Sequence, residues 1–188
     1  DNASNSSLES ILDLEQRDQP ILNDTKKLII IYGIAAGMKY LHSHDIIHCE
    51  LKISEIFLDD YLFPKIAELG KSKRAYQKSH VLDSEKKNNF RDEIHYSPEA
   101  QINNRPILAS DVYSFAMIVY ELIMDEKPFE GCNIYEILTD ICYKNLRPKF
   151  KRPIPECYKK LIEKCWAQDP KDRPTFDEIE YHLRTNEE

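Results

Sequence analysis

Residues 47–58 read IHCELKISEIFL, and residues 68–70 read ELG. The first stretch places one histidine, one lysine and two glutamates within positions 48–55 and then becomes apolar. A second apolar run at 62–67 follows Asp59-Asp60, which predicts a small β-hairpin in which Pro64 favours an edge position. Glutamate oxygens bind hard cations, and carboxylates held close together without a cation repel one another. A loop of charged side chains therefore leads directly into the hairpin.

Helical periodicity surrounds this loop on both sides. One broad apolar face predicts a long helix before it, formed by Ile30, Ile31, Ile34, Met38 and Leu41. After it, the helix that we expect from Asp111 is apolar nearly all round and should be central. Further helices are predicted around 134–141 and 158–165, and residues 175–178 form a capping box for a last one. Residues 70–94 show no periodicity, and such long stretches tend to be functional or disordered.

Length and composition narrow the class of protein. With 188 residues, of which 41% are hydrophobic, the chain fits one domain with a sizeable core. The net charge of −7 argues against binding to nucleic acid or to an anionic membrane, because both favour basic surfaces. Five cysteines without a C-x-x-C pair predict reduced thiols rather than disulfides or a zinc site, and hence a cytoplasmic location. The apolar stretches are shorter than the roughly 20 residues of a membrane span. The chain begins with Asp rather than Met, so we expect it to be a piece of a longer protein.

The stretches at 47–58 and 68–70 resemble the catalytic loop and the metal-binding loop of a eukaryotic protein kinase. In that family the motifs read H-R-D-L-K-x-x-N and D-F-G. The chain keeps His48, Leu51 and Lys52 of the first motif and Gly70 of the second. The positions that differ are occupied by Cys49, Glu50, Glu55, Glu68 and Leu69. The frame is kept, whereas the residues that handle protons and magnesium are changed.

Other motifs of the family follow in the same order. Residues 34–43 are similar to the end of its E helix, the SPE at 97–99 to A-P-E, and residues 110–115 to the start of its F helix. The CWAQDP at 165–170 and the RPTF at 173–176 are similar to the tail of the tyrosine-kinase-like group. The Gly-rich loop, strand lysine and helix glutamate of the N-terminal lobe are not found in this sequence. The resemblance therefore implies a protein-kinase-like fold restricted to the C-terminal lobe, mostly α-helical with one small β-hairpin.

The resemblance also assigns parts and roles. Residues 1–188 would be a partial protein kinase domain, 48–58 its catalytic-loop-like part and 68–99 its activation-segment-like part. Glu50 stands where the family has the aspartate that accepts the proton of the substrate hydroxyl, and Lys52 where a lysine contacts the transferred phosphate.

The remaining cofactor positions follow from the same resemblance. Glu55 and Glu68 stand at the two magnesium-binding positions, and Phe57 stands beneath the adenine, where relatives carry a smaller aliphatic residue. An active member would use ATP and Mg²⁺, and an inactive one needs no cofactor. Glutamate is one methylene longer than aspartate, and moving a reacting group by about 1 Å can cost around a hundredfold in rate.

The structural positions of the family are retained. His48 matches a histidine that packs beside the Phe of D-F-G, where Leu69 can pack instead. Glu99 and Arg173 match a buried ion pair, and Asp111 matches the aspartate that braces the backbone of the catalytic loop.

Cys49 and the basic run at 71–74 do not correspond to residues that the family retains. Cys49 replaces an arginine that clamps a phosphorylated activation loop in relatives, and a thiol cannot make that forked contact. The basic run at 71–74 is expected to be a solvated loop.

Three interpretations follow. The altered loop favours a pseudokinase, a regulatory or interaction module that binds protein partners through the helix near 134–141 and the activation-like segment. The alternative is an active Ser/Thr protein kinase that uses ATP and Mg²⁺ and takes its N-terminal lobe from upstream sequence. The third is a non-functional remnant of a duplicated kinase gene.

Overall fold

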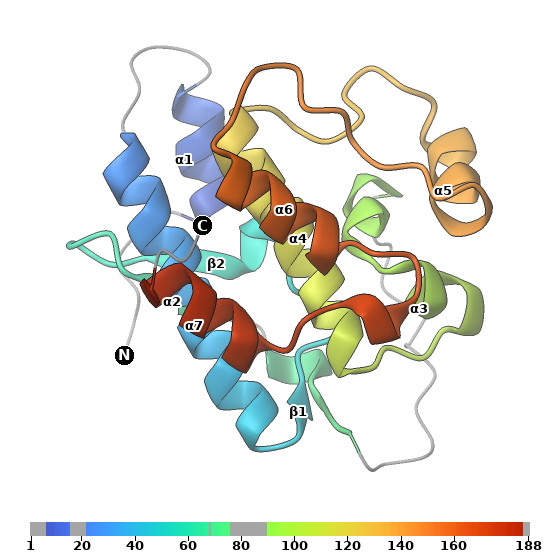
Figure 1. The fold of residues 1–188 in the computed structure, drawn as a ribbon, viewed down its shortest axis with the longest axis horizontal. Helices are drawn as coiled ribbons and strands as arrows, with labels where there is room; N and C mark the ends of the chain where they lie inside the picture. The colour runs from blue at the N-terminus through green and yellow to red at the C-terminus, as the bar shows by residue number, and fades with distance from the viewer. Residues whose placement is uncertain (1–6, 16–21, 68, 76–89, 186–188) are drawn as a thin grey trace.

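The central element of the fold is α4 (Leu108–Met124), around which the other helices pack (Figure 1). The computed structural model describes residues 7–15, 22–67, 69–75 and 90–185. The predicted burial of this helix on nearly all sides is confirmed, since Phe115, Ile118 and Val119 have no exposed surface. The helix begins before Asp111, because Ser110 Oγ accepts a hydrogen bond from the N–H of Ile107 at 3.0 Å and stabilises the first turn.

The long helix predicted before the loop is α2 (Asp24–Ser43). Asn23 caps its N-terminus by accepting a hydrogen bond from the N–H of Lys26 at 2.9 Å. Its predicted apolar face is buried and packs against α4, α7 and the hairpin. None of the helices in the described ranges is long and apolar enough to cross a membrane.

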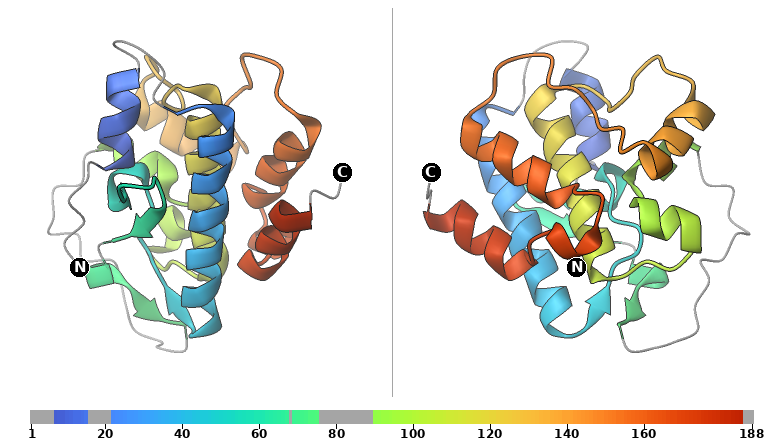
Figure 2. Two further views of the ribbon diagram at one scale, coloured as in Figure 1. Left: turned by 90° about the vertical axis from the view of Figure 1, so that its left-hand side faces the viewer. Right: turned by 45° about the vertical axis from the view of Figure 1, so that its right-hand side comes forward.

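The remaining helices complete a mostly helical body. They are α1 (Leu8–Glu15), α3 (Pro98–Asn103), α5 (Ile134–Tyr143), α6 (Glu156–Cys165) and α7 (Phe176–Thr185). Figure 2 shows α7 beside α2 and α6 beside α4, in agreement with their contacts. The predicted helices α5, α6 and α7 are confirmed, and Thr175 and Glu178 form the expected capping box with backbone contacts of 2.8 and 3.3 Å. Helix α3 was not predicted because six residues are too few to show a period.

Short 3₁₀ turns connect several of these elements. Those in the described ranges are η1 (Ile53–Glu55), η2 (Leu69–Lys71), η3 (Phe90–His95) and η4 (Pro170–Asp172).

Two antiparallel two-stranded sheets flank the catalytic-like loop. The predicted hairpin is confirmed: β2 (Ile56–Leu58) pairs with β3 (Pro64–Ile66), and Pro64 lies opposite Leu58. The second sheet pairs β1 (Ile46–Ile47) with β4 (Lys73–Arg74). It was not predicted, because strands of two residues carry no alternating pattern. Together the sheets fix both ends of the loop.

Gly33 allows α2 to approach β3 closely. A Cβ atom at this position would lie 2.5 Å from Cγ of Pro64, whereas one at Gly37 would lie 2.9 Å from the terminal Cδ1 of Ile66. We expect Gly33→Ala to lower the free energy of unfolding by about 1–3 kcal/mol, because the proline ring cannot turn away. Gly37→Ala should cost much less, because the isoleucine end can rotate. Urea denaturation of both variants measures the difference, and equal losses would contradict this account.

Candidate functional site

Glu50 lies in the loop between β1 and β2, and only 5% of its surface is exposed. Lys71 Nζ donates a hydrogen bond to Glu50 Oε1 at 2.7 Å. Lys52 Nζ lies 3.6 Å from the same oxygen, and the hydroxyl of Tyr96 lies 3.5 Å from it. Three donors thus converge on one carboxylate oxygen. A substrate hydroxyl must displace at least one of them before Oε1 can accept its proton.

Glu50 and Glu55 are linked by a shared cation. Lys52 Nζ is 3.6 Å from Glu50 Oε1 and 3.7 Å from Glu55 Oε1. The hydroxyl of Ser54 also donates to Glu55 Oε1 at 3.2 Å. The repulsion expected between these two carboxylates is therefore offset by Lys52, and Lys71 adds a second positive charge.

The prediction that residues 71–74 form a solvated loop is wrong. Lys71 binds Glu50, and Lys73 and Arg74 form β4 and pair with β1. The hydroxyl oxygen of Ser72 is buried as well. The error has a simple cause, because the partner of Lys71 lies 21 positions away and leaves no local signal.

His48 ties the loop to the segment that follows the hairpin. It is fully buried, its Nε2 is 3.0 Å from the carbonyl oxygen of Ala67, and its Nδ1 is 3.3 Å from the N–H of Glu50. These contacts require a neutral ring that carries its proton on Nε2, so both nitrogens are committed to the backbone. Leu69 lies in η2 and is 49% exposed, and its expected packing beside this ring stays a prediction. Gly70 lies in the same exposed turn.

Asp111 braces the backbone of the loop from α4. It is buried, and its two oxygens accept hydrogen bonds from the N–H groups of His48 at 2.8 Å and Cys49 at 3.0 Å. His42 Nε2 lies 2.9 Å from Oδ2. Cys49 has a φ of 71°, a left-handed conformation that disfavours residues with a Cβ and is here held by Asp111.

The thiol of Cys49 is unsuited to nucleophilic chemistry. Burial and, to a smaller extent, the charge of Asp111 raise its pKa to about 12. At neutral pH it is therefore protonated, and only the thiolate is nucleophilic.

Arg173 and Glu99 form a forked ion pair. Arg173 Nη1 and Nη2 donate to the two carboxylate oxygens of Glu99 at 2.8 and 2.9 Å. Arg173 also donates to the carbonyl oxygens of Ala167 and Ala109, each at 2.8 Å. Burial raises the pKa of Glu99, but hydrogen bonds, above all from Arg173, outweigh it and bring the pKa below its ordinary value.

The remaining cofactor positions are only partly described. Glu68 lies outside the described residues, so its metal-binding role stays a prediction. Within the described part of the chain, no group of three or more His, Cys, Asp or Glu side chains is arranged to hold a metal ion. Glu50 and Glu55 face lysines there and do not form an open set of oxygen ligands for Mg²⁺.

Phe57 lies in the middle of β2, opposite Lys65 in the register. It is half-buried, whereas its neighbours Ile56 and Leu58 are fully buried on the other face of the strand. Its assignment beneath an adenine stays a prediction.

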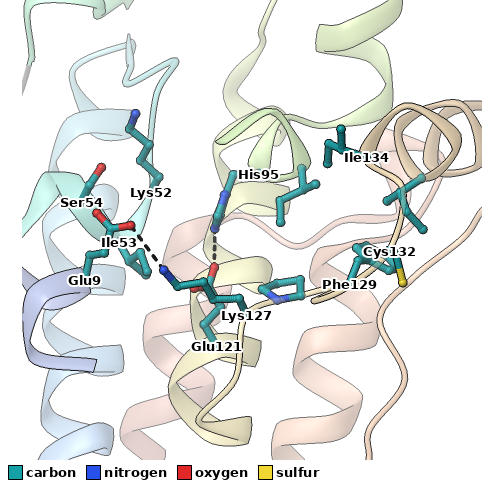
Figure 3. Close-up of a pocket in the computed structure, with 13 residues that line it drawn as sticks. Glu9, Lys52, Ile53, Ser54, His95, Glu121, Lys127, Phe129, Cys132 and Ile134 are labelled. Carbon is teal, nitrogen blue, oxygen red and sulfur yellow. Dashed lines mark hydrogen bonds and ion pairs between the residues drawn. The ribbon is translucent and has the colours of Figure 1, made fainter. Parts of the chain in front are cut away.

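A cavity of about 80 Å³ lies beside the catalytic-like loop (Figure 3). Lys52 and Ser54 line one side, and Ile134 of α5 lines the other. His95 and Glu121 also line the cavity. His95 Nε2 contacts Glu121 Oε1 at 2.6 Å, and both side chains are buried. The sequence interpretation missed this pair. The available signal was Glu121 itself, a charged residue within an otherwise apolar helix.

Sequence comparison agrees with this geometry. A family model described as protein tyrosine and serine/threonine kinase matches residues 3–183. The chain belongs to the protein kinase family. The predicted family and its C-lobe-like, mostly helical fold are therefore confirmed.

Several relatives of this kinase domain are serine/threonine kinases by name. It is 32% identical over 169 residues to a probable serine/threonine-protein kinase of Dictyostelium discoideum, covering 90% of this chain and 12% of that protein. It is 31% identical over 171 residues to the serine/threonine-protein kinase STY17 of Arabidopsis thaliana, covering 90% and 29%. It is 32% identical over 154 residues to mitogen-activated protein kinase kinase kinase 12 of Rattus norvegicus, covering 80% and 16%. The kinase domain thus spans less than a third of the length of each.

Proposed function

We propose that this kinase domain is a pseudokinase, a module that regulates phosphorylation signalling through protein contacts and not by phosphoryl transfer. The observation that carries the proposal is the ion pair of Glu50 with Lys71, at 2.7 Å. A catalytic base needs an accessible oxygen within hydrogen-bond reach of the substrate hydroxyl. Here the residue is buried, and one of its two carboxylate oxygens, Oε1, is already bound by an ammonium group from the next segment.

The charges around Lys52 support the same proposal. In an active kinase, positive charge at this loop stabilises the transferred phosphoryl group. Lys52 instead lies between Glu50 and Glu55, which offset that charge. The longer glutamate side chains would also displace their oxygens relative to the family's aspartate and asparagine. A displacement of about 1 Å can cost around a hundredfold in rate, and the costs of several displacements in one site are not additive.

Catalysis by the domain is the second candidate. It is favoured by the names of several relatives, which are serine/threonine kinases, and by the presence of Lys52 at the family position. On this alternative the cofactors are ATP and Mg²⁺, and the product is a phosphorylated protein hydroxyl.

The proposed partners are proteins, and the proposed compartment is the cytoplasm. Helix α5 offers a surface for such contacts, because Tyr135 and Tyr143 are 62% and 73% exposed. The cysteines are all unpaired, which suits a reducing compartment.

A phosphotransfer assay on the full-length protein tests the proposal. We expect Mg²⁺-dependent transfer from ATP by the unmodified protein to equal that of its Glu50→Ala variant. The restored variant combines Glu50→Asp, Glu55→Asn and Glu68→Asp. This triple variant is prepared alone, with Cys49→Arg, with Lys71→Ala, and with both. We expect at least one restored combination to exceed the unmodified protein by about a hundredfold or more.

Two controls complete the design. Thermal unfolding of every variant shows whether it is folded, since Cys49→Arg introduces a long side chain at a buried position with positive φ. Glu50→Ala in the unmodified protein separates its own turnover from a contaminating kinase. Turnover that depends on Mg²⁺ and is abolished by Glu50→Ala would contradict the pseudokinase proposal and establish the alternative.

A further inference from the structure

A groove of about 600 Å³ lies where β1, β4, the start of α4 and η4 meet. Among the described residues that line it, four are basic and none is acidic: Lys73, Arg74, Arg105 and Lys171. The rest of its lining is aliphatic or proline and includes Ile47 and Ile107. We call this the basic groove. In Figure 1 its walls lie around β1 at the lower end of the molecule.

The walls come from four separate parts of the sequence that are tied together. Ile47 pairs with Lys73 across the β1–β4 sheet, and the N–H of Ala75 donates to Asp45 O at 2.8 Å. Arg173, next to η4, donates to the carbonyl oxygen of Ala109 in α4 at 2.8 Å. Because these contacts fix the walls before any ligand arrives, binding costs little ordering of the site.

The charge of the groove contrasts with that of the whole chain. The chain carries a net charge of −7, yet four cations gather here. Arg74, Arg105 and Lys171 are exposed, and Lys73 is half-buried on the same face of the sheet as Ile47. Asp169 caps η4 and Asp172 is its last residue, but neither lines the groove. Cations set among apolar walls focus a positive potential in the groove.

We propose that the basic groove binds an acidic peptide segment of a partner protein. Charge complementarity favours an anionic ligand, and the apolar residues that line the groove favour a ligand that also has apolar side chains. Ile107, which lines the groove, is 44% exposed, and a small ion such as phosphate has no apolar part to cover it. A peptide with glutamates beside leucine side chains matches both features. The inference rests on the proposed interaction role of the domain, since it names the chemistry of one partner.

Fluorescence anisotropy with a labelled probe tests the proposal on the full-length protein. The probe is a short peptide of alternating glutamates and leucines. We expect saturable binding that weakens from 50 to 300 mM NaCl, because salt screens exposed charges. The double charge reversal Arg105→Glu with Lys171→Glu should weaken binding by about tenfold or more.

A matched double reversal serves as the control. Lys160→Glu with Lys164→Glu changes the net charge equally on exposed positions of α6, away from the groove. Its affinity should stay within about twofold of the unmodified protein, because only the local charge of the groove matters. Equal weakening by both double variants would overturn the proposal. If the groove variant unfolds at a lower temperature, single Arg105→Gln and Lys171→Gln variants replace it, each expected to weaken binding about threefold.

The apolar lining of the groove and the ligand class are tested separately. Ile107→Ser should weaken probe binding about threefold to tenfold, because a side chain that the leucines cover is lost. A peptide in which serines replace the leucines should bind to the unmodified protein as weakly as the original probe binds to Ile107→Ser. Competition by inorganic phosphate alone at low millimolar concentration, or tighter binding to anionic vesicles than to the probe, would overturn the peptide assignment.

These outcomes are distinct from failure of the proposed function. The anisotropy measurement contains no nucleotide, so its result does not depend on whether the domain transfers phosphate. Turnover in the phosphotransfer assay with normal probe binding would remove the pseudokinase proposal alone. Absent probe binding with no turnover would remove the groove proposal alone.

Discussion

Arg173→Ala is expected to lower the free energy of unfolding by about 3–5 kcal/mol, because it leaves Glu99 as a partly buried, uncompensated charge. The side chain of Arg173 is fully buried, and its loss also removes the donors to the carbonyl oxygens of Ala167 and Ala109. Unfolding in urea at pH 7, followed by circular dichroism, measures the change.

Two further variants show that the geometry of this contact matters. Arg173→Lys keeps the charge but cannot make the forked contact with Glu99, so most of the loss should remain. Arg184 is 60% exposed and makes weak contacts, with Glu180 at 3.8 Å and with the ring of Tyr181, so Arg184→Ala should leave the urea midpoint nearly unchanged. A similar loss in Arg184→Ala and Arg173→Ala would contradict this account.

The same ion pair gives the stability a pH dependence. The pKa of Glu99 in the folded protein is below its ordinary value, which is about 4.3 in an unfolded chain. Such a group contributes stability that is fully present above the unfolded pKa and is lost as the pH falls through the folded pKa. The difference in stability between the unmodified protein and Glu99→Gln should therefore be largest near pH 7 and shrink below about pH 4. Urea midpoints at both pH values test this.

Asp111→Asn is expected to lower the free energy of unfolding by about 2–4 kcal/mol, because hydrogen bonds to a buried charged group are worth about 1.5–3 kcal/mol each. The N–H groups of His48 and Cys49 bind different oxygens of Asp111, so in asparagine one of them would face the NH₂ group, which is a donor, instead of an acceptor. The strained φ of Cys49 then loses its main support. Urea denaturation measures the loss.

Cys49 provides a second measurement of the same variant. In the unmodified protein its thiol is buried and its pKa is raised to about 12, so a thiol reagent should react only with better exposed cysteines such as Cys132. In Asp111→Asn an additional thiol should react at neutral pH, and Cys49→Ala in that background should abolish it. An exposed aspartate on α7 gives the matched control, and Asp177→Asn should change neither measurement. Unchanged thiol reactivity in Asp111→Asn would show that the brace does not hold the loop.

Much of the fold could be predicted from periodicity. Helices α2 and α4 have long apolar faces, and the hairpin has two apolar runs on either side of Asp59-Asp60. The β1–β4 sheet could not be predicted in this way, because its strands are two residues long and join segments far apart. Their pairing depends on how α2 and α4 pack, which is a tertiary effect.

The candidate site was predictable in position but not in its contacts. The motif at 48–55 located Glu50, Lys52 and Glu55, and the structure brings both carboxylates within 4 Å of the Lys52 ammonium group. Lys71 was assigned to solvent because a sequence does not show which distant carboxylate a lysine will reach. His95 and Glu121 were missed for the same reason, since their contact forms only when η3 packs on α4.

Because Glu50 pairs with Lys71, a single substitution at position 50 is not enough to restore the family's catalytic motif. An aspartate at position 50 is too short to keep the 2.7 Å contact, so it would leave Lys71 as a half-buried cation beside Lys52. Contacting residues are not additive in their effects, and each change here alters the consequence of the other. A lineage that returned to the family's motif would therefore have to change position 71 as well, a position outside the motif itself.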